Sequence, residues 1–119
     1  MAKKKVRNPS IGAGEVGEEG RPVAYEVTVI VEPELIEAFE RYMPGHIADV
    51  IATGFFTGAT LERCEPGCYR TRYEAPGQSS LDRYLATHAD RLRSDFVLHF
   101  PDGVDVSRET WVDVYRRAV

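Results

Sequence analysis

Residues 23–43 read VAYEVTVIVEPELIEAFERYM, and the change of hydrophobic period inside this stretch decides the fold. Up to residue 31, valines and a tyrosine alternate with Ala24, Glu26, Thr28 and Ile30, which predicts a β-strand. From Pro33 the apolar residues recur three and four positions apart, as on the buried face of a helix: Leu35, Ile36, Phe39 and Met43. Pro33 suits the first turn of that helix, because the amide hydrogen that proline lacks has no partner there.

The sequence Met43-Pro44-Gly45 interrupts this helical pattern. A proline inside a helix removes one hydrogen bond and a glycine loosens the backbone, so we expect a break or kink here. A second helical segment then covers residues 46–52 and ends before Gly54, which suits the left-handed position after a helix.

The rest of the chain predicts two strands, a helix and a last strand. Residues 55–65 and 68–75 alternate as strands, and Pro66-Gly67 between them is typical of a type II turn. Ser79 or Ser80 is expected to cap a helix with an apolar stripe at Leu81, Tyr84, Leu85, His88, Leu92 and Phe96. Phe100-Pro101-Asp102-Gly103 ends this helix, and a valine-rich strand covers residues 104–114.

The order β-α-β-β-α-β is that of the ferredoxin-like fold. It predicts an α+β domain with a four-stranded antiparallel sheet and both helices on one face. The other face has no cover, and it carries the second set of side chains from the first and third strands: Ala24, Glu26, Thr28, Ile30, Arg70 and Arg72. Because a half-apolar sheet face is costly to leave in water, we expect a homodimer that packs sheet on sheet.

The charge of −4 divides unevenly at Pro22. Residues 1–22 hold every lysine, four glycines, and five basic against three acidic groups, so we expect a flexible basic arm there. Residues 23–119, the predicted α+β domain, carry ten basic and sixteen acidic groups. Such a domain repels phosphate, which makes nucleic acid an unfavourable partner although RNA-recognition domains share this topology. The cluster at Lys3–Lys5 and Arg7 leaves the arm as a docking segment for an acidic protein partner.

No run of about 20 apolar residues occurs, and no apolar segment of a signal peptide follows the lysines, so we expect no membrane span and a cytoplasmic location. The two cysteines, Cys64 and Cys68, lie on either side of the predicted turn. With a two-residue loop Cys64 faces Tyr69, the thiols lie on opposite faces of the hairpin, and they stay unpaired. With a three-residue loop they face each other and a bridge becomes feasible.

A set of short motifs runs through the domain from residue 23 to about residue 114. They are Tyr25–Val29, His46-Ile47-Ala48-Asp49-Val50, Thr53-Gly54-Phe55-Phe56, Tyr69–Tyr73, Tyr84-Leu85, Leu92-Arg93 and Arg108. This set resembles a small bacterial family of unknown function, a domain of unknown function whose members are similar to dimeric α+β barrel proteins. The resemblance implies the ferredoxin-like dimeric fold. It implies no single activity, because related barrels include monooxygenases, isomerases, haem enzymes and sensors. The chain departs from the family at Met43-Pro44-Gly45, where members have a longer and more polar link.

His46 is the candidate catalytic residue, because a neutral imidazole in a cleft can accept or donate a proton. Its structural alternative is to cap backbone groups that Pro44 leaves exposed. Arg108 shares the apolar face of the last strand, where its guanidinium needs a carboxylate, a carbonyl or a ligand anion. A pair with Glu26 or another acidic residue of a strand is the structural alternative, and orientation of an anionic ligand is the functional one. Thr53 and Tyr73 complete the candidate ligand-binding set.

The other histidines fit structural roles. His88 lies on the apolar stripe as a core histidine, and His99 suits the carboxyl end of its helix. No two histidines are four residues apart and no carboxylate completes a triad, so the sequence predicts no metal site and names no cofactor. Two functions stay open: a module that binds a small aromatic or carbonyl-bearing molecule, with catalysis near His46, and an accessory subunit that docks through residues 1–22.

Overall fold

The structure is a computed structural model that describes residues 20–119. Most of the predicted arm, including its basic cluster, lies outside these residues. Its last two residues are bound to the domain, since the Arg21 guanidinium donates to the Asp113 carbonyl over 2.9 Å and the Asp113 amide donates to the Pro22 carbonyl over 3.0 Å.

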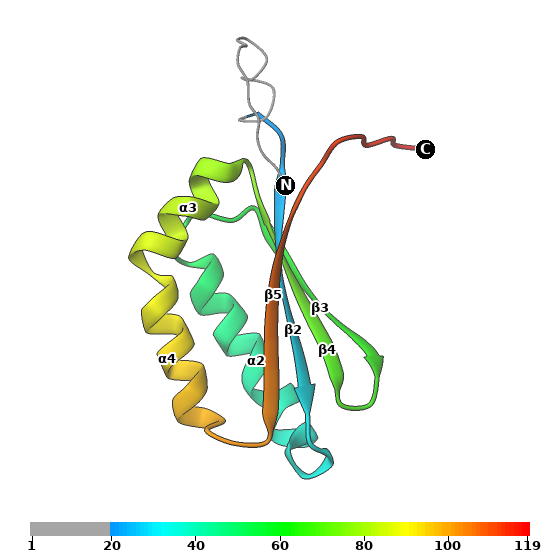
Figure 1. Cartoon of the computed structure of the whole chain (residues 1–119), viewed down its shortest axis with the longest axis vertical. Coiled ribbons are helices and arrows are strands. Elements are labelled where there is room, and N and C mark those ends of the chain that lie inside the picture. The colour runs from blue at the N-terminus through cyan, green and yellow to red at the C-terminus, as the bar shows by residue number, and fades with distance from the viewer. Residues whose placement is uncertain (1–19) are drawn as a thin grey trace, which may run out of the picture.

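Four strands form one antiparallel sheet in the order β3-β4-β2-β5, which confirms the predicted α+β, ferredoxin-like architecture (Figure 1). Strand β2 covers Val23–Val31, and it pairs on one side with β4, Cys68–Ala75, and on the other with β5, Val104–Val112. Strand β3, Gly58–Glu65, lies at the edge beside β4. Strand β5 ends at Val112, two residues before the boundary predicted for the last strand.

The helices all lie on one face of this sheet (Figure 1). A single 3₁₀ turn η1, Pro33–Leu35, leads into α2, Ile36–Ile51, and the second helical region divides into α3, Gln78–Thr87, and α4, Ala89–His99. Two apolar clusters fill the space between helices and sheet, one around Leu81 and Tyr84 and the other around Phe39, Phe96 and Phe100.

Helix α2 runs through Pro44 without interruption, so the predicted break is wrong. Pro44 cannot donate an amide hydrogen bond, but the helix keeps Phe39, Met43 and Val50 buried in the core on both sides of it. Because Pro44 itself is exposed, its ring meets solvent and no packed neighbour. The predicted end of the helix is confirmed by Gly54, whose φ of +87° is the left-handed conformation that glycine adopts without strain.

The long helix predicted from Ser79 or Ser80 differs from the structure at both its start and its middle. It begins at Gln78 after the extended Gly77, with neither serine as its cap. It then ends at Thr87, and His88, with φ −125° and ψ −25°, separates it from α4. His88 is therefore not a core histidine on a continuous stripe. Its ring packs against Phe55 at 5.8 Å, and Nδ1 lies 3.2 Å from the Arg91 guanidinium.

The β3–β4 hairpin has the predicted two-residue loop, with Glu65 opposite Cys68 and Gly67 at a φ of +89°. Beyond the turn the register shifts: Tyr69 faces Arg63, and Cys64 is the extra residue of a β-bulge. The bulge turns Cys64 toward Cys68, so the prediction of thiols on opposite faces is wrong. Both cysteines are free, and they line the same surface hollow together with Thr28, Glu62 and Arg70. Burial, and next the adjacent Cys64, raise the pKa of the Cys68 thiol.

The face of the sheet away from the helices is more polar than the first strand alone indicates. Glu26 is 7% exposed, pairs with the Arg72 guanidinium at 2.5 Å and lies 3.9 Å from that of Arg70. Two large apolar side chains on this face are about half exposed, Ile30 at 49% and Trp111 at 53%. We refer to this surface, which also carries Glu62, Glu74 and Glu109, as the open face.

Candidate functional site

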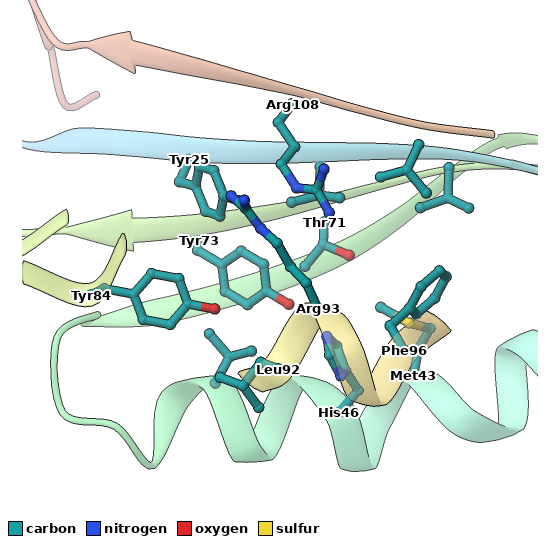
Figure 2. A pocket seen from close by; sticks show the side chains of 14 residues that line it. Tyr25, Met43, His46, Thr71, Tyr73, Tyr84, Leu92, Arg93, Phe96 and Arg108 are labelled. Atoms are coloured by element: carbon teal, nitrogen blue, oxygen red, sulfur yellow. The ribbon is translucent and has the colours of Figure 1, made fainter. Parts of the chain in front are cut away.

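A small pocket lies between the helices and the inner face of the sheet, with a cavity of about 40 Å³ (Figure 2). Strands β2, β4 and β5 form its roof, and α2, α3 and α4 its floor and walls. Its lining is apolar and aromatic, with Met43, Leu92 and Phe96 among the buried residues. A cavity of this volume has space for a few atoms, so its occupant is small or enters as mobile side chains at the mouth move aside.

Two guanidiniums meet at this pocket, that of Arg108 from β5 and that of Arg93 from α4 (Figure 2). Arg93 donates to the Tyr25 phenol oxygen over 2.7 Å. Within residues 20–119 no carboxylate lies within 4.0 Å of either guanidinium, although Arg63, Arg70 and Arg72 all have such partners. The predicted structural pairing of Arg108 with Glu26 is wrong, because Arg108 faces the helices and Glu26 faces the opposite side.

Three buried hydroxyl groups point into the pocket from the opposite side, those of Tyr73, Tyr84 and Thr71 (Figure 2). These residues are 3%, 4% and 2% exposed, and none of the three hydroxyls has a hydrogen-bond partner in the described part of the chain. Burial raises the pKa of Tyr84 to about 12 and raises that of Tyr73 further, so both phenols keep their protons. Because an unpartnered buried hydroxyl is costly, these groups are donors that a bound oxygen atom can satisfy.

His46 projects from α2 into the same pocket. Its Nδ1 lies 3.2 Å from the Tyr42 phenol oxygen, and the two rings stack with centroids 5.4 Å apart. Burial lowers the pKa of His46, while Asp95 and Asp49 act in the opposite direction. The imidazole is therefore mainly neutral at pH 7. The alternative role as a backbone cap is not observed, since the ring bonds to a side chain and α2 is continuous.

The structure brings three of the four predicted site residues together: His46, Tyr73 and Arg108. Thr53 does not line the pocket, and its hydroxyl donates to the Val50 carbonyl over 2.6 Å at the end of α2. His99 ends α4 as predicted, with Nδ1 donating to the Asp95 carbonyl over 3.0 Å.

Several residues that line the pocket or lie directly behind it were not predicted as site residues. Arg93 and Tyr84 belong to the quoted motifs, but the sequence indicates a site role for neither, and Tyr84 fits the apolar stripe of its helix. Tyr42 stands four residues before His46, a spacing that places two side chains on one helix face and could have indicated the pair. Asp95, which accepts a hydrogen bond from Tyr42 over 2.6 Å, is 53 residues away and carries no such signal.

The described residues contain no group of three or more histidine, cysteine, aspartate or glutamate side chains that could hold a metal ion. In the same part of the chain, none of the helices has the length and apolar character that crossing a membrane requires.

The fold and the pocket define an α+β domain of the ferredoxin-like class, with a site between the helices and the inner face of the sheet. The chain belongs to a family described as a domain of unknown function, DUF4286, whose model matches residues 23–114. This membership confirms the resemblance found in the sequence. No match is found among curated proteins.

Solved structures with the same fold cover most of the chain. A dimeric ferredoxin-like protein from an uncultured marine organism is 12% identical, with 82% of this chain and 98% of that one covered and a TM-score of 0.60. A protein of unknown function from Nitrosomonas europaea is 11% identical, with 85% and 97% covered and a TM-score of 0.62. SnoaB, a cofactor-independent oxygenase from Streptomyces nogalater, is 17% identical, with 85% and 97% covered and a TM-score of 0.52. At these identities the likeness establishes the fold alone.

Proposed function

We propose that the domain binds a small anionic molecule in the pocket between its helices and sheet. The observation that carries this proposal is the pair of guanidiniums, Arg93 and Arg108, which meet at an apolar pocket without a carboxylate partner in residues 20–119. Two like charges beside each other repel, and a bound carboxylate or phosphate relieves that repulsion while accepting their hydrogen bonds. The apolar wall and the free hydroxyls of Tyr73 and Tyr84 suit the rest of a small organic acid.

The oxygenase neighbour is a distant protein of the same fold, and its cofactor-independent oxygenase activity supports a small-molecule site on this scaffold. His46 at the pocket adds the means for proton transfer. A catalytic role for His46 and ligand contacts from Tyr73 and Arg108 are therefore part of the proposal. Thr53 is not, because its hydroxyl is bound at the end of α2.

The test is a titration of the ¹⁵N-labelled protein with acetate, benzoate and phosphate, followed by amide chemical shifts. We expect shifts around Arg93, Arg108 and Thr71 at low salt. Arg108→Gln removes charge-assisted hydrogen bonds of about 1.5–3 kcal/mol and should weaken binding roughly tenfold to a hundredfold. Arg91→Gln is the matched control, since Arg91 is exposed on α4, the helix that carries Arg93, and does not line the pocket. Equal weakening in both variants, or no shifts at the pocket with any of the three anions, would contradict the proposal.

The homodimer belongs to the same proposal, with the open face as its interface. The dimeric ferredoxin-like neighbour supports it, and so do the half-exposed Trp111 and Ile30 at the two ends of that face. Between them lie charges of both signs, with Glu26 bonded to Arg72 and Glu62 to Arg70 at 2.8 Å. Two copies related by a twofold axis can bring such charges into opposite-sign contact, so the surface can pair with itself.

The second candidate function, an accessory subunit that docks through residues 1–22, rests on the concentration of lysines in that segment. It predicts that deletion of residues 2–22 abolishes capture of an acidic partner and leaves the domain folded. The anion-binding function predicts that the same deletion leaves the pocket titration unaltered. The two functions are thus separable with one truncated protein.

A further inference from the structure

A chain of hydrogen bonds connects the pocket histidine to a carboxylate on the neighbouring helix. The Tyr42 hydroxyl, on α2, lies 2.6 Å from Oδ2 of Asp95 on α4 and 3.2 Å from Nδ1 of His46. Tyr42 and Asp95 do not line the pocket, so this chain approaches His46 from behind.

The direction of each proton in the chain follows from the chemistry of its members. An ionised carboxylate only accepts hydrogen bonds, so the single phenol proton of Tyr42 is donated to Asp95. Burial and this bond to Asp95 raise the pKa of Tyr42 well above its usual range, which keeps that proton on the phenol. The phenol oxygen then has only lone pairs to offer His46, so Nδ1 must be the donor in the second bond.

This arrangement decides which ring nitrogen of His46 is free. A neutral imidazole has one N–H group, and Tyr42 holds it at Nδ1. Nε2 is left as a bare lone pair, and in residues 20–119 it has no hydrogen-bond partner. Since the ring projects from α2 into the pocket, that lone pair is available to a ligand there (Figure 2).

The groups around the pocket complete a set of complementary roles. Arg93 and Arg108 supply positive charge for a carboxylate, and the protonated phenols of Tyr73 and Tyr84 supply donors for a carbonyl oxygen. His46 supplies a proton acceptor. The cavity of about 40 Å³ limits the molecule that can meet all three to a few heavy atoms.

We propose that Asp95 and Tyr42 are positioning residues that hold His46 as the general base of this pocket, and that the substrate is a small oxo acid with an acidic C–H group beside its carbonyl. The proposal rests on the anion-binding function proposed above. The proton passes from carbon to Nε2 and leaves an imidazolium, and the electron pair of the C–H bond moves into an enolate. The phenols donate to the enolate oxygen, and Asp95, through Tyr42, stabilises the imidazolium charge. Return of the proton to carbon needs no further reactant.

The first test measures the tautomer of His46 in the ligand-free protein by long-range ¹H–¹⁵N NMR at pH 7.5, and it is independent of ligand binding. We expect the Nδ1–H tautomer in the wild type. In Asp95→Ala the Tyr42 proton loses its carboxylate and turns toward Nδ1, so the tautomer should change to Nε2–H. In Tyr42→Phe the preference for Nδ1–H should be lost, whereas Tyr115→Phe, an exposed tyrosine far from the pocket, should keep it. An Nε2–H wild type, or an unchanged tautomer in the folded Asp95→Ala variant, overturns the proposal.

The second test uses pyruvate as the probe and measures exchange of its methyl protons in D₂O by ¹H NMR. We expect exchange above the buffer rate with the wild type, a loss of at least tenfold in His46→Gln and an intermediate rate in Asp95→Ala. Pyruvate that binds, as judged by Arg108-dependent amide shifts, but does not exchange overturns the general-base proposal. Absence of binding would instead contradict the proposed function, and the tautomer measurement would then decide the arrangement of the base by itself.

Discussion

Enlarging the pocket at Phe96 should create a site for a small aromatic acid, and the cost and the rescue can both be estimated. Phe96 is 9% exposed, lines the pocket and packs against His46 at 6.0 Å and Phe100 at 5.3 Å between ring centroids. Phe96→Ala should lower the free energy of unfolding by about 3–5 kcal/mol, as for other buried phenylalanines. The new cavity is continuous with the one that Arg93 and Arg108 border, so benzoate can place its ring in the hole and its carboxylate at the guanidiniums.

The control is Phe39→Ala, which removes the same group from a fully buried side chain that does not line the pocket. Its hole should cost as much, but it offers a carboxylate no cation. Urea unfolding with and without benzoate is the assay. At ten times its dissociation constant for Phe96→Ala, benzoate should restore about 1.4 kcal/mol to that variant and clearly less to Phe39→Ala, which keeps only the original small pocket. Equal stabilisation of both variants would refute the role given to the arginines, and the double variant Phe96→Ala, Arg108→Gln should no longer respond.

Four further predictions follow from single features of the structure. Burial lowers the pKa of His46, so the unfolded chain takes up a proton at a higher pH than the folded one. The contribution of His46 to the free energy of unfolding is therefore full above about pH 6.5 and falls as the pH drops toward the folded pKa. Urea unfolding at pH 5.0 and 7.5 should show this pH dependence in the wild type and not in His46→Gln. Pro44→Ala restores a missing amide donor at an exposed helix position and should raise the unfolding free energy by about 1–3 kcal/mol, measured by the same method; an unchanged or lower value would contradict the interpretation of the continuous helix. Trp111→Lys on the open face should convert a dimer into a monomer in sedimentation at micromolar concentration, and a wild type that is already monomeric would exclude the proposed interface. Iodoacetamide should alkylate the exposed Cys64 faster than Cys68, whose pKa is raised, and mass spectrometry of the native protein after short exposure should show this order.

The order of elements was predictable because each has a clear period and clear ends. The alternation in residues 23–31 and the glycines at positions 54 and 67 act through local backbone geometry, and the structure agrees with both. The errors arise where tertiary packing or a small local change outweighs a local preference. Pro44 stays inside a helix because the core on either side holds that helix together, and the shift of one residue at Cys64 changes the face on which a thiol lies.

Only part of the candidate site was predictable, because its other contacts join elements that are far apart in the sequence. Arg108 stood out as a charged group in an apolar strand pattern, His46 as an imidazole directly after Pro44-Gly45, and Tyr73 as an apolar ring with a polar tip, and a single sequence reveals each of these. The Asp95–Tyr42–His46 chain joins two helices, and no spacing along the sequence predicts which helix faces are in contact. The unpartnered state of the buried hydroxyls likewise depends on what surrounds them in three dimensions.

Within residues 20–119 four other arginines are closely paired with carboxylates, whereas Arg93 and Arg108 at the pocket, like the exposed Arg83 and Arg91, are not. In this acidic domain Arg63, Arg70, Arg72 and Arg116 each have a carboxylate within 3.1 Å, so carboxylate partners are readily supplied. Arg108 is separated from Glu26 by strand register alone: it pairs with Val27 and not with Thr28, and it therefore projects to the side of the helices. A shift of one residue would place it on the open face among glutamates. The observed register instead brings the exposed Arg108 guanidinium to the edge of the pocket that Arg93 and His46 also line, where it can bind an anion without first breaking an ion pair.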